Sequence, residues 1–239
     1  MTDYLKTELS DDDDSELRER GFVVLRGLVS SERMERLGIA YNNAVASARG
    51  DDVHIGSAST RVADFVNRGP EFDDLYIFPP LLEACDRVIG GPFKLSSFHS
   101  RTLRPRTPAD GLHVDVQRDS ADWPLLSFIL MVDEFRPENG ATRFVPGSHL
   151  WPGTPADAIS DSRADHPEQV LACGPAGSLL IFNGSVWHGH TANTSSRGRR
   201  SLQGAFIPRD GRAGTDFTDR MQPETLARLG PLAKQVLAI

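Results

Sequence analysis

The first third of the chain shows helical patterning around one short apolar run. The stretch SELRER predicts a helix that ends at Gly21, and the β-rich run at 22–25 predicts a strand. Ser30 or Ser31 can cap a second helix, because the apolar positions in MERLGIAY recur with helical period. We therefore expect a helix, a strand and a second helix in this part of the chain.

Residues 50–77 lack such a pattern. They are rich in Gly, Asp, Ser and Asn, so we predict irregular structure there. His54 and Arg61 fall in this segment, and loops of this kind can form a lid over a site. Pro79 starts a further predicted helix, whose apolar run LLEACDRVIG ends at Gly90.

From residue 93 the pattern changes to short β-rich runs separated by Pro, Gly, Asp and Asn. These runs are FKLSSFHSRTL, LLSFILMV, ATRFVPG, GSLLIFNG and RRSLQGAFI. Such spacing is typical of an antiparallel sandwich or barrel. No repeat or linker divides the chain, so we predict a single domain over 1–239. Its parts are a helix-rich region 1–92, a β core 93–210 and a C-terminal helix 222–238.

Composition narrows the possible partners. The chain has 239 residues, of which 39% are hydrophobic and 25% charged, and its net charge is -7. A nucleic-acid-binding surface needs a clustered excess of Lys and Arg, so we predict no nucleic-acid partner. The acidic run at 11–14 is expected to be solvated and to favour the start of the helix after it.

The sequence shows no signal for export or for membrane insertion. The stretch MTDYLKTELSDDDD is polar and acidic, unlike a signal peptide, and the longest apolar stretch, 123–132, is too short to cross a bilayer. Cys85 and Cys173 form no CxxC pair, and two cysteines are too few for a disulfide framework. We interpret both as small buried hydrophobes, and we predict a cytoplasmic protein with no membrane partner.

A histidine and an aspartate lie one residue apart in GLHVDVQ, residues 111–117. On a strand, residues i and i+2 point to the same face, so His113 and Asp115 would reach one ion while Val114 turns away. The same pair also fits a polar strand face that binds nothing. Its interpretation therefore depends on a third ligand.

A third candidate ligand follows an apolar strand in SLLIFNGSVWHGHTAN. The run at 179–182 ends at Asn183, and Trp187 and His188 come next in a mostly apolar setting. Two imidazoles and one carboxylate on one side of an ion form the facial triad of non-haem Fe(II) oxygenases, which leaves coordination positions open. A closed zinc site would need four ligands, usually with thiolates, and neither cysteine has suitable spacing.

The stretch SSRGRRSLQGAF presents an arginine to a possible β core. On a strand, Arg199, Ser201 and Gln203 share one face, whereas Arg200 and Leu202 share the other. An arginine aimed into the core needs an anionic partner, because an unpaired buried charge is costly. A small-molecule carboxylate would supply it, and the alternatives are a surface arginine cluster or a salt bridge to a protein acid.

The order of these stretches resembles the phytanoyl-CoA dioxygenase family of Fe(II)/2-oxoglutarate oxygenases. The motifs that carry the resemblance are HVD, NGATRFVPGSH and WHGHTANTSSRGRRS, with support from GPEFDDLYIFPPLLEACDRVIGGPFKL and RERGFVVLRGLVSSERMERL. The similarity covers nearly the whole chain. It implies a mainly β fold with added helices around a double-stranded β-helix, the cupin-like jelly roll. It also implies Fe(II), 2-oxoglutarate and O2 as cofactors.

The resemblance assigns the iron ligands residue by residue. His113, Asp115 and His188 match the ligands, and Arg199 matches the arginine that binds the distal carboxylate of 2-oxoglutarate. His190 competes with His188 because HGH presents two histidines at strand spacing. The register of the family favours His188, so His190 is expected to support the site or to face the substrate.

Three further positions match features of the family around the co-substrate. Ser201 completes an Arg-x-Ser pattern, and Thr142 lies where related small-molecule oxygenases place a threonine near 2-oxoglutarate. Asn193 matches a motif asparagine, which we expect to form a turn or to support the site. Relatives often carry a glutamine three residues before the first iron ligand, where this chain has Asp110. The sequence does not assign a role to Asp110.

Other side chains are candidates for the substrate pocket. His99 and Arg101, in FHSRTL, would share a face of a strand that leads to the site. Trp187, like Trp123 and Trp151, is expected in the core or in the pocket wall.

The function implied by the resemblance is hydroxylation of an unactivated C–H bond of a small-molecule metabolite, in natural-product biosynthesis, with succinate and CO2 as co-products. Asp115 favours this outcome, since related halogenases have a small residue there. Desaturation, epimerisation or cyclisation can use the same triad. From other classes, a cupin-like hydrolase or isomerase, or a non-catalytic binding module, would need no Arg199. The identity of the substrate and the oligomeric state are not predicted.

Overall fold

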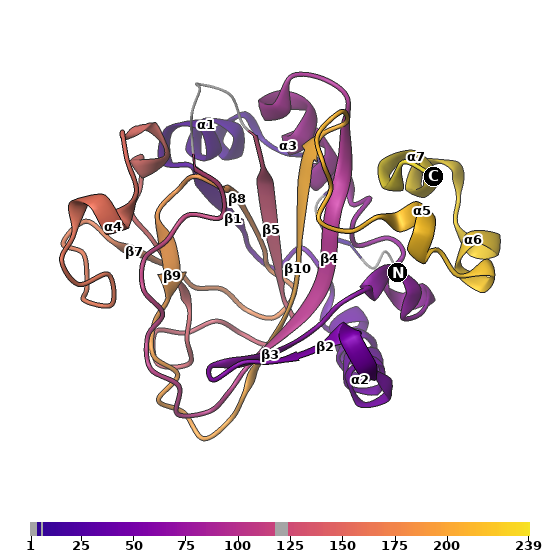
Figure 1. Ribbon diagram of the computed structural model, residues 1–239, viewed down its shortest axis with the longest axis horizontal. Coiled ribbons are helices and arrows are strands. Elements are labelled where there is room, and N and C mark those ends of the chain that lie inside the picture. The colour runs from indigo at the N-terminus through magenta and orange to yellow at the C-terminus, as the bar shows by residue number, and fades with distance from the viewer. Residues whose placement is uncertain (1–3, 6, 118–123) are drawn as a thin grey trace.

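The computed structural model describes residues 4–5, 7–117 and 124–239, and its strands form two antiparallel sheets (Figure 1). The large sheet contains, in spatial order, β1 (Phe22–Leu25), β8 (Leu179–Asn183), β5 (Leu126–Met131), β10 (Arg199–Pro208), β4 (Phe93–Leu103), β3 (Ser59–Val62) and β2 (Val53–Ile55). The small sheet contains β7 (Val170–Ala172), β6 (Thr142–Phe144) and β9 (His188–His190). All five β-rich runs predicted after residue 93 therefore contain strands.

The two sheets pack face to face through aromatic and aliphatic side chains. Phe22 of β1 stacks on Phe144 of β6 with ring centroids 4.3 Å apart, and Phe182 of β8 meets Phe144 edge-on. Ile129 and Leu180 from the large sheet complete this layer. Alternation along each strand brings these residues to one face, so the sandwich closes by burying one side of each sheet.

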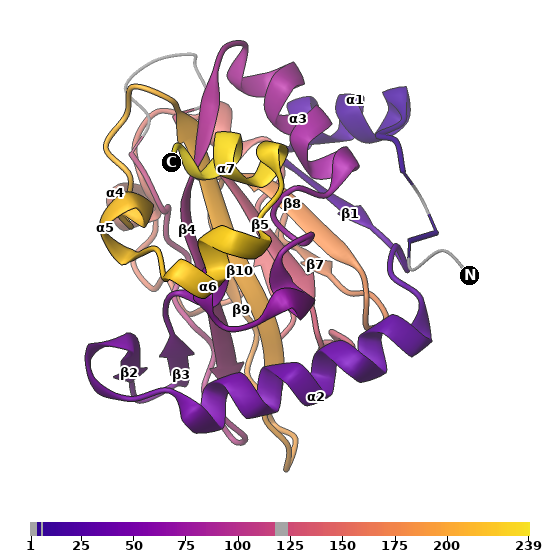
Figure 2. The same ribbon diagram turned by 90° about the vertical axis from the view of Figure 1, so that its right-hand side faces the viewer.

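Helices cover the opposite face of the large sheet (Figure 2). The three longest are α1 (Asp11–Arg20), α2 (Ser31–Ser47) and α3 (Pro79–Ile89). Leu37 and Tyr41 of α2 are buried in this second layer with Leu202 of β10, and the hydroxyl groups of Tyr41 and Thr102 lie 2.9 Å apart. The apolar face of the amphipathic helix α2 therefore packs against the sheet.

The ends of these helices follow local capping chemistry. Ser10 and Asp13 form a capping box at the start of α1, and Gly21 ends that helix in the left-handed conformation at φ 81°. The acidic run at 11–14 forms the first turn of α1 instead of preceding it, where its charge complements the helix dipole. Ser30 caps α2. The predicted ends at Gly21 and Gly90 are confirmed.

The prediction of irregular structure over 50–77 is wrong in part. β2 and β3 form a hairpin, and β3 pairs with β4 in a register that sets Arg61 opposite Arg101. The run Ser-Thr-Arg-Val of β3 becomes a strand because β4 offers an edge to pair with. The segment therefore extends the large sheet, and Arg61 belongs to a strand.

The single helix predicted over 222–238 is also wrong. The structure has α6 (Pro223–Arg228) and α7 (Pro231–Leu237), with Leu229 and Gly230 between them. A proline has no amide hydrogen and disfavours helical geometry in the residue before it, so Pro231 starts a new helix.

Shorter elements complete the described chain. α4 (Pro155–Ala158) and α5 (Phe217–Arg220) are single turns, and 3₁₀ turns cover Gly50–Asp52, Phe65–Asn67, Pro70–Phe72 and Ser148–Leu150. Among the described helices, none is long and apolar enough to cross a membrane. Cys85 is buried and Cys173 is half-buried, and both are free thiols.

Candidate active site

The three predicted metal ligands lie together at the edge of the small sheet. His113, Asp115 and His188 each offer one ligand atom, and these atoms lie within 4.8 Å of one another. His188 belongs to β9 and His113 is bridged to it, with the His113 amide 2.8 Å from the His188 carbonyl. The Asp115 amide bonds to the Gly184 carbonyl at 2.8 Å, which fixes the second ligand.

GLHVDVQ does not form a regular strand. Only His113 forms a β-bridge, and the residues after it bend. The backbone of this segment runs so close to β9 that a Cβ on Gly189 would lie 3.0 Å from the Gly111 carbonyl oxygen. A glycine between the two histidines of HGH thus admits the segment that carries His113.

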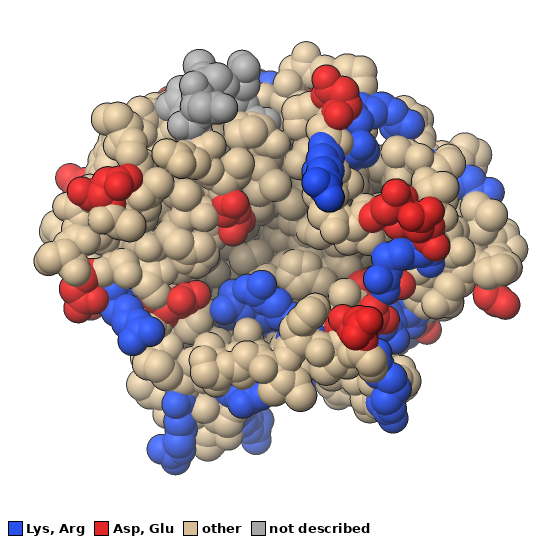
Figure 3. Space-filling view, viewed as in Figure 1, with Lys and Arg blue, Asp and Glu red and all other residues tan. Residues whose placement is uncertain are grey.

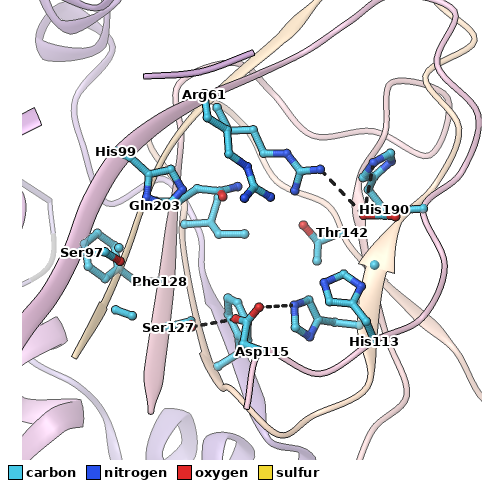
Figure 4. A pocket seen from close by; sticks show the side chains of 18 of the residues that line it. Arg61, Ser97, His99, His113, Asp115, Ser127, Phe128, Thr142, His190 and Gln203 are labelled. Carbon is cyan, nitrogen blue, oxygen red and sulfur yellow. Dashed lines mark hydrogen bonds and ion pairs between the residues drawn. The ribbon is translucent and has the colours of Figure 1, made fainter. Parts of the chain in front are cut away.

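Both ligand rings are oriented by backbone carbonyls. Nδ1 of His113 lies 2.9 Å from the Gly111 oxygen, and Nδ1 of His188 lies 2.8 Å from the Val186 oxygen. A carbonyl only accepts, so each Nδ1 carries the proton and each Nε2 keeps a lone pair for a metal ion. Figure 4 shows His113 and Asp115 pointing into the same cavity.

The charges at the triad are coupled. Burial raises the pKa of Asp115, but hydrogen bonding and charge at His188 outweigh it, and the pKa falls to about 2. Burial likewise lowers the pKa of His188, but the Asp115 carboxylate, 3.6 Å from its Nε2, raises it above the ordinary value. Burial and the charge of His188 lower the pKa of His113. Ser127 donates to the other oxygen of Asp115 at 3.1 Å.

His190 is separate from the triad. Its Nδ1 donates to the Thr191 carbonyl at 2.9 Å, and its Nε2 lies 3.8 Å from an oxygen of Asp110. Burial, together with the charges of Arg101 and Arg199, lowers its pKa to about 4. His188 therefore completes the cluster, and His190 faces another part of the cavity.

A cavity of about 230 Å³ lies between the two sheets beside the triad (Figure 4). On the surface, it opens as the hollow in the middle of Figure 3. The side chains that line it come from both sheets and from the segment that carries His113. The charged and polar ones are Arg61, Ser97, His99, Arg101, Asp110, Ser127, Thr142, His190, Arg199 and Gln203.

Arg199 projects into this cavity with its charge unpaired. Its side chain is buried, and its Nε and Nη1 atoms have no hydrogen-bond partner among the described residues. Its guanidinium carbon lies 3.8 Å from the centre of the Phe135 ring. Burial and the charge of Arg101 lower its pKa to about 9, so it remains cationic at neutral pH. A buried cation with free donors in a cavity is suited to bind an anion.

The structure separates the other predicted residues into two groups. Thr142, His99 and Arg101 line the cavity, as does His190. Ser201 does not line it, although it is buried beside it and donates to the Arg101 carbonyl at 3.3 Å.

Asn193 and Trp187 lie away from the cavity. The amide of Asn193 donates to the carbonyls of Arg104 and Arg197 at 2.9 Å each, which fits its predicted role in a turn. Trp187 precedes His188, so alternation turns it to the other face. There it meets Trp151 edge-on, with ring centroids 5.3 Å apart. Trp123 lies outside the described residues.

Several lining residues were not assigned to the pocket from the sequence. Arg61 reaches the cavity from β3, whereas the exposed His54 of β2 does not line it. Ser97 and Gln203 extend the polar faces of β4 and β10. Ser127 could have been predicted as a site residue, because it is the one polar residue inside the apolar run LLSFILMV.

The sequence profile of the phytanoyl-CoA dioxygenase (PhyH) family matches residues 17–201. The chain belongs to this family. Membership identifies an oxidoreductase, and it confirms Fe(II), 2-oxoglutarate and O2 at the level of the family. The resemblance read from HVD and WHGHTANTSSRGRRS is therefore confirmed.

Curated relatives include fungal dioxygenases that align along most of the chain. The multifunctional dioxygenase prhA of Penicillium brasilianum is 31% identical over 239 aligned residues, covering 88% of this chain and 76% of its own. The dioxygenase trt7 of Aspergillus terreus is 29% identical and covers 92% of this chain and 81% of its own.

Solved structures support the fold. HygX of Streptomyces hygroscopicus, with nickel and 2-oxoglutarate bound, has a TM-score of 0.69 at 16% identity, covering 90% of this chain and 94% of its own. The nogalamycin carbocyclase SnoK has a TM-score of 0.67 at 21% identity, covering 90% and 92%. The predicted jelly-roll core is confirmed.

The residues present fit the cofactors of the family. Two imidazoles with oriented Nε2 atoms and one ionised carboxylate form a donor set suited to Fe(II) with open positions. The unpartnered donors of Arg199 suit a carboxylate in the same cavity.

Proposed function

We propose that this chain is an Fe(II)- and 2-oxoglutarate-dependent oxygenase that hydroxylates an unactivated C–H bond of a small-molecule metabolite. His113, Asp115 and His188 would hold the iron, and Arg199 would bind the distal carboxylate of 2-oxoglutarate. The observation that carries this proposal is the unpartnered guanidinium of Arg199 in the cavity that the triad also lines. A hydrolase, an isomerase or a binding module built on the same triad would not need it.

Each protein group has a defined task in this proposal. The carbonyls of Gly111 and Val186 hold the two imidazoles with Nε2 free, and Ser127 orients the Asp115 carboxylate. Arg199 supplies a fixed pair of donors, so the co-substrate would bind in one orientation. Thr142 lines the cavity between these groups. When bound, the iron with 2-oxoglutarate and O2 supplies the oxidising chemistry, with succinate and CO2 as co-products.

The reaction outcome depends on the substrate as well as on the triad. The carboxylate of Asp115 supports hydroxylation over halogenation, because it occupies the position that a halide would need. Among the structural neighbours, SnoN is an epimerase, with a TM-score of 0.67 at 20% identity, and SnoK is a carbocyclase. Desaturation, epimerisation and cyclisation therefore stay the alternatives on the same site.

The proposal is tested by coupling three measurements on one sample of Fe(II)-loaded protein. Oxygen uptake, succinate formation and products are followed by electrode and mass spectrometry while metabolite extracts are supplied. We expect succinate in proportion to oxygen, and a product heavier by one oxygen atom. A product of unchanged mass, or one lighter by two hydrogens, would replace hydroxylation by one of the alternatives. Turnover that does not depend on oxygen would overturn the assignment of the chain as an oxygenase.

The setting of the reaction stays a prediction. We propose a small-molecule substrate in natural-product biosynthesis, with no nucleic-acid or membrane partner, in the cytoplasm. The net charge of -7 and the named small-molecule biosynthetic neighbours support it. The single-domain organisation over 1–239 likewise stays a prediction.

A further inference from the structure

The cavity carries more positive charge than the proposed cofactors use. Three arginines line it, Arg61, Arg101 and Arg199, against two carboxylates, Asp110 and Asp115. The arginines of the described lining thus exceed its carboxylates by one, three against two. Burial and the nearby arginines lower the pKa of His99 to about 4, so it is neutral at pH 7.

Cofactor binding leaves this excess in place. A divalent ion would add two positive charges and the dianion of 2-oxoglutarate would remove two, while the ligand histidines stay neutral. Arg61 lies at the exposed rim of the cavity, but the Arg101 side chain is only 14% exposed, and a cation at that depth is costly without an anion in hydrogen-bond contact. A third molecule with one negative charge would restore the balance.

Neither Arg61 nor Arg101 has a carboxylate within hydrogen-bond distance among the described residues. They are paired across β3 and β4, and the charge of Arg61 helps burial to lower the pKa of Arg101 to about 10. Arg101 is only 14% exposed, and the nearest carboxylate oxygen, on Asp110, is 3.8 Å away, beyond hydrogen-bond distance. Its Nε donates to Ser59 at 3.3 Å. No hydrogen bond or ion pair of Arg61 joins it to another described residue.

Their position separates this pair from the iron ligands. Figure 4 shows Arg61 reaching into the cavity from the side opposite Asp115, with His99 and Gln203 beside it. The wall also has an apolar part, which includes Leu125 and Phe128. An occupant would therefore meet two cations at one end and hydrophobic side chains along its body.

We propose that the substrate is a small amphiphilic organic acid with one negative charge, bound through that charge by Arg61 and Arg101. This inference rests on the proposed function, because the charge count includes the metal ion and 2-oxoglutarate. A carboxylate fits the single excess charge better than a phosphate monoester, which carries about -1.5 to -2 at pH 7. The apolar part of the acid lies along Leu125 and Phe128, toward the triad.

The test measures binding of matched probes without turnover. The Ni(II)-loaded protein with saturating 2-oxoglutarate is melted in the presence of octanoate or benzoate, of their methyl esters, and of phenyl phosphate. We expect the acids to raise the Tm, the esters to leave it unchanged, and phenyl phosphate to act more weakly than benzoate. Equal effects of the acids and their esters would overturn the proposal.

Variants assign the effect to the arginine pair. Arg61→Gln and Arg101→Gln should each weaken octanoate binding by about tenfold or more, and Arg101→Lys should restore part of it. Arg104→Gln is the matched control, because Arg104 follows β4 without lining the cavity. Octanoate binding unchanged in both glutamine variants would overturn the assignment.

Calorimetry separates this inference from the proposed function. 2-Oxoglutarate should bind Arg61→Gln and Arg101→Gln as it binds the unaltered protein, and should bind Arg199→Gln weakly. Loss of 2-oxoglutarate binding in the first two would show that the pair serves the co-substrate, which overturns the inference and leaves the oxygenase intact. If the unaltered protein bound neither nickel nor 2-oxoglutarate, the proposed function would fail. The acid preference would then be measured on the metal-free protein, in which Arg61 and Arg101 still line the cavity.

Discussion

The two faces of β10 place adjacent arginines in opposite surroundings. Arg199 points into the cavity and leaves two nitrogen atoms without a partner among the described residues. Arg200 points to the other face, where it binds both oxygens of Asp133 and the side chain of Asn42. A satisfied cation holds the fold together, whereas an unsatisfied buried cation marks a place for a ligand.

The same contrast holds for the two faces of the large sheet. The outer face buries Leu202 with aromatic and aliphatic side chains under the helices. The inner face, near the triad, carries charged groups whose partners are distant or absent among the described residues. Substitutions on the inner face should change binding, and substitutions on the outer face should change stability.

The largest effect is expected from the carboxylate of the triad. Asp115→Ala removes one of three metal ligands on the inner face, so iron-dependent turnover and stoichiometric Fe(II) binding should both be lost. The Tm of the metal-free protein should fall modestly, because the contacts with His188 and Ser127 that lower the pKa of Asp115 are lost from a side chain that is 38% exposed. Succinate production at the rate of the unaltered protein would refute the ligand assignment.

The two arginines of β10 provide the direct comparison. Arg199→Gln should weaken 2-oxoglutarate binding by about 2–5 kcal/mol, or roughly 30-fold to several thousandfold, with no loss of stability. Arg200→Gln should lower the free energy of unfolding by about 1.5–3 kcal/mol through its hydrogen bonds to Asp133, with 2-oxoglutarate binding unchanged. Calorimetry and urea unfolding on both variants measure the four values. The reverse pattern would assign the clamp to Arg200.

A smaller effect is expected from a group that acts through Asp115. Ser127→Ala removes the hydrogen bond to one carboxylate oxygen and should weaken metal binding by about tenfold. The size of the side chain barely changes, so stability should be retained. Ser97→Ala is the matched control, since Ser97 also lines the cavity and has no contact with the triad. Equal metal affinity in both variants would show that Ser127 does not support metal binding through Asp115.

The smallest effect is a pH dependence of metal affinity near neutrality. The pKa of His188 in the metal-free protein is raised above 6.5, and a metal ligand must be deprotonated. Affinity should therefore rise by about tenfold per pH unit below that raised pKa and level off above it. Asp115, with a pKa of about 2, adds no proton competition in this range.

Stability of the metal-free protein should change in the opposite direction. The proton on His188 stabilises the fold fully below pH 6.5, and this contribution is lost as pH rises through the raised pKa. Metal titrations and thermal melts over the same pH series measure both trends. A metal affinity that is constant from pH 6 upward would contradict the coupling of His188 to Asp115.

Local signals made much of this fold predictable. The C-terminal ends of α1 and α3 could be predicted because a glycine follows each helix, and the start of α3 because a proline begins it. The strand β10 could be predicted from the alternation of polar and apolar residues along it. The hairpin of β2 and β3 was missed because its strands depend on pairing with β4, a contact distant in sequence. That omission also hid Arg61, which reaches the cavity only through this pairing.

The candidate site was likewise predictable only in part. The triad and Arg199 were found through spacing and family resemblance, although the segment of His113 is not a regular strand. Of the two places predicted for Trp187, the core and the pocket wall, the structure has the core, because its position just before His188 turns it away from the cavity. The network of Asp110 with Arg101 and His190 depends on tertiary contacts alone.

One triad and one free inward arginine should bind a metal ion and 2-oxoglutarate together. Anaerobic calorimetry with 2-oxoglutarate, in the presence and absence of Fe(II), tests it most directly. We expect one 2-oxoglutarate to bind per chain, far more tightly with Fe(II) present, and this binding to be lost in Arg199→Gln but not in Arg200→Gln. Binding of 2-oxoglutarate that is independent of both Fe(II) and Arg199 would contradict it.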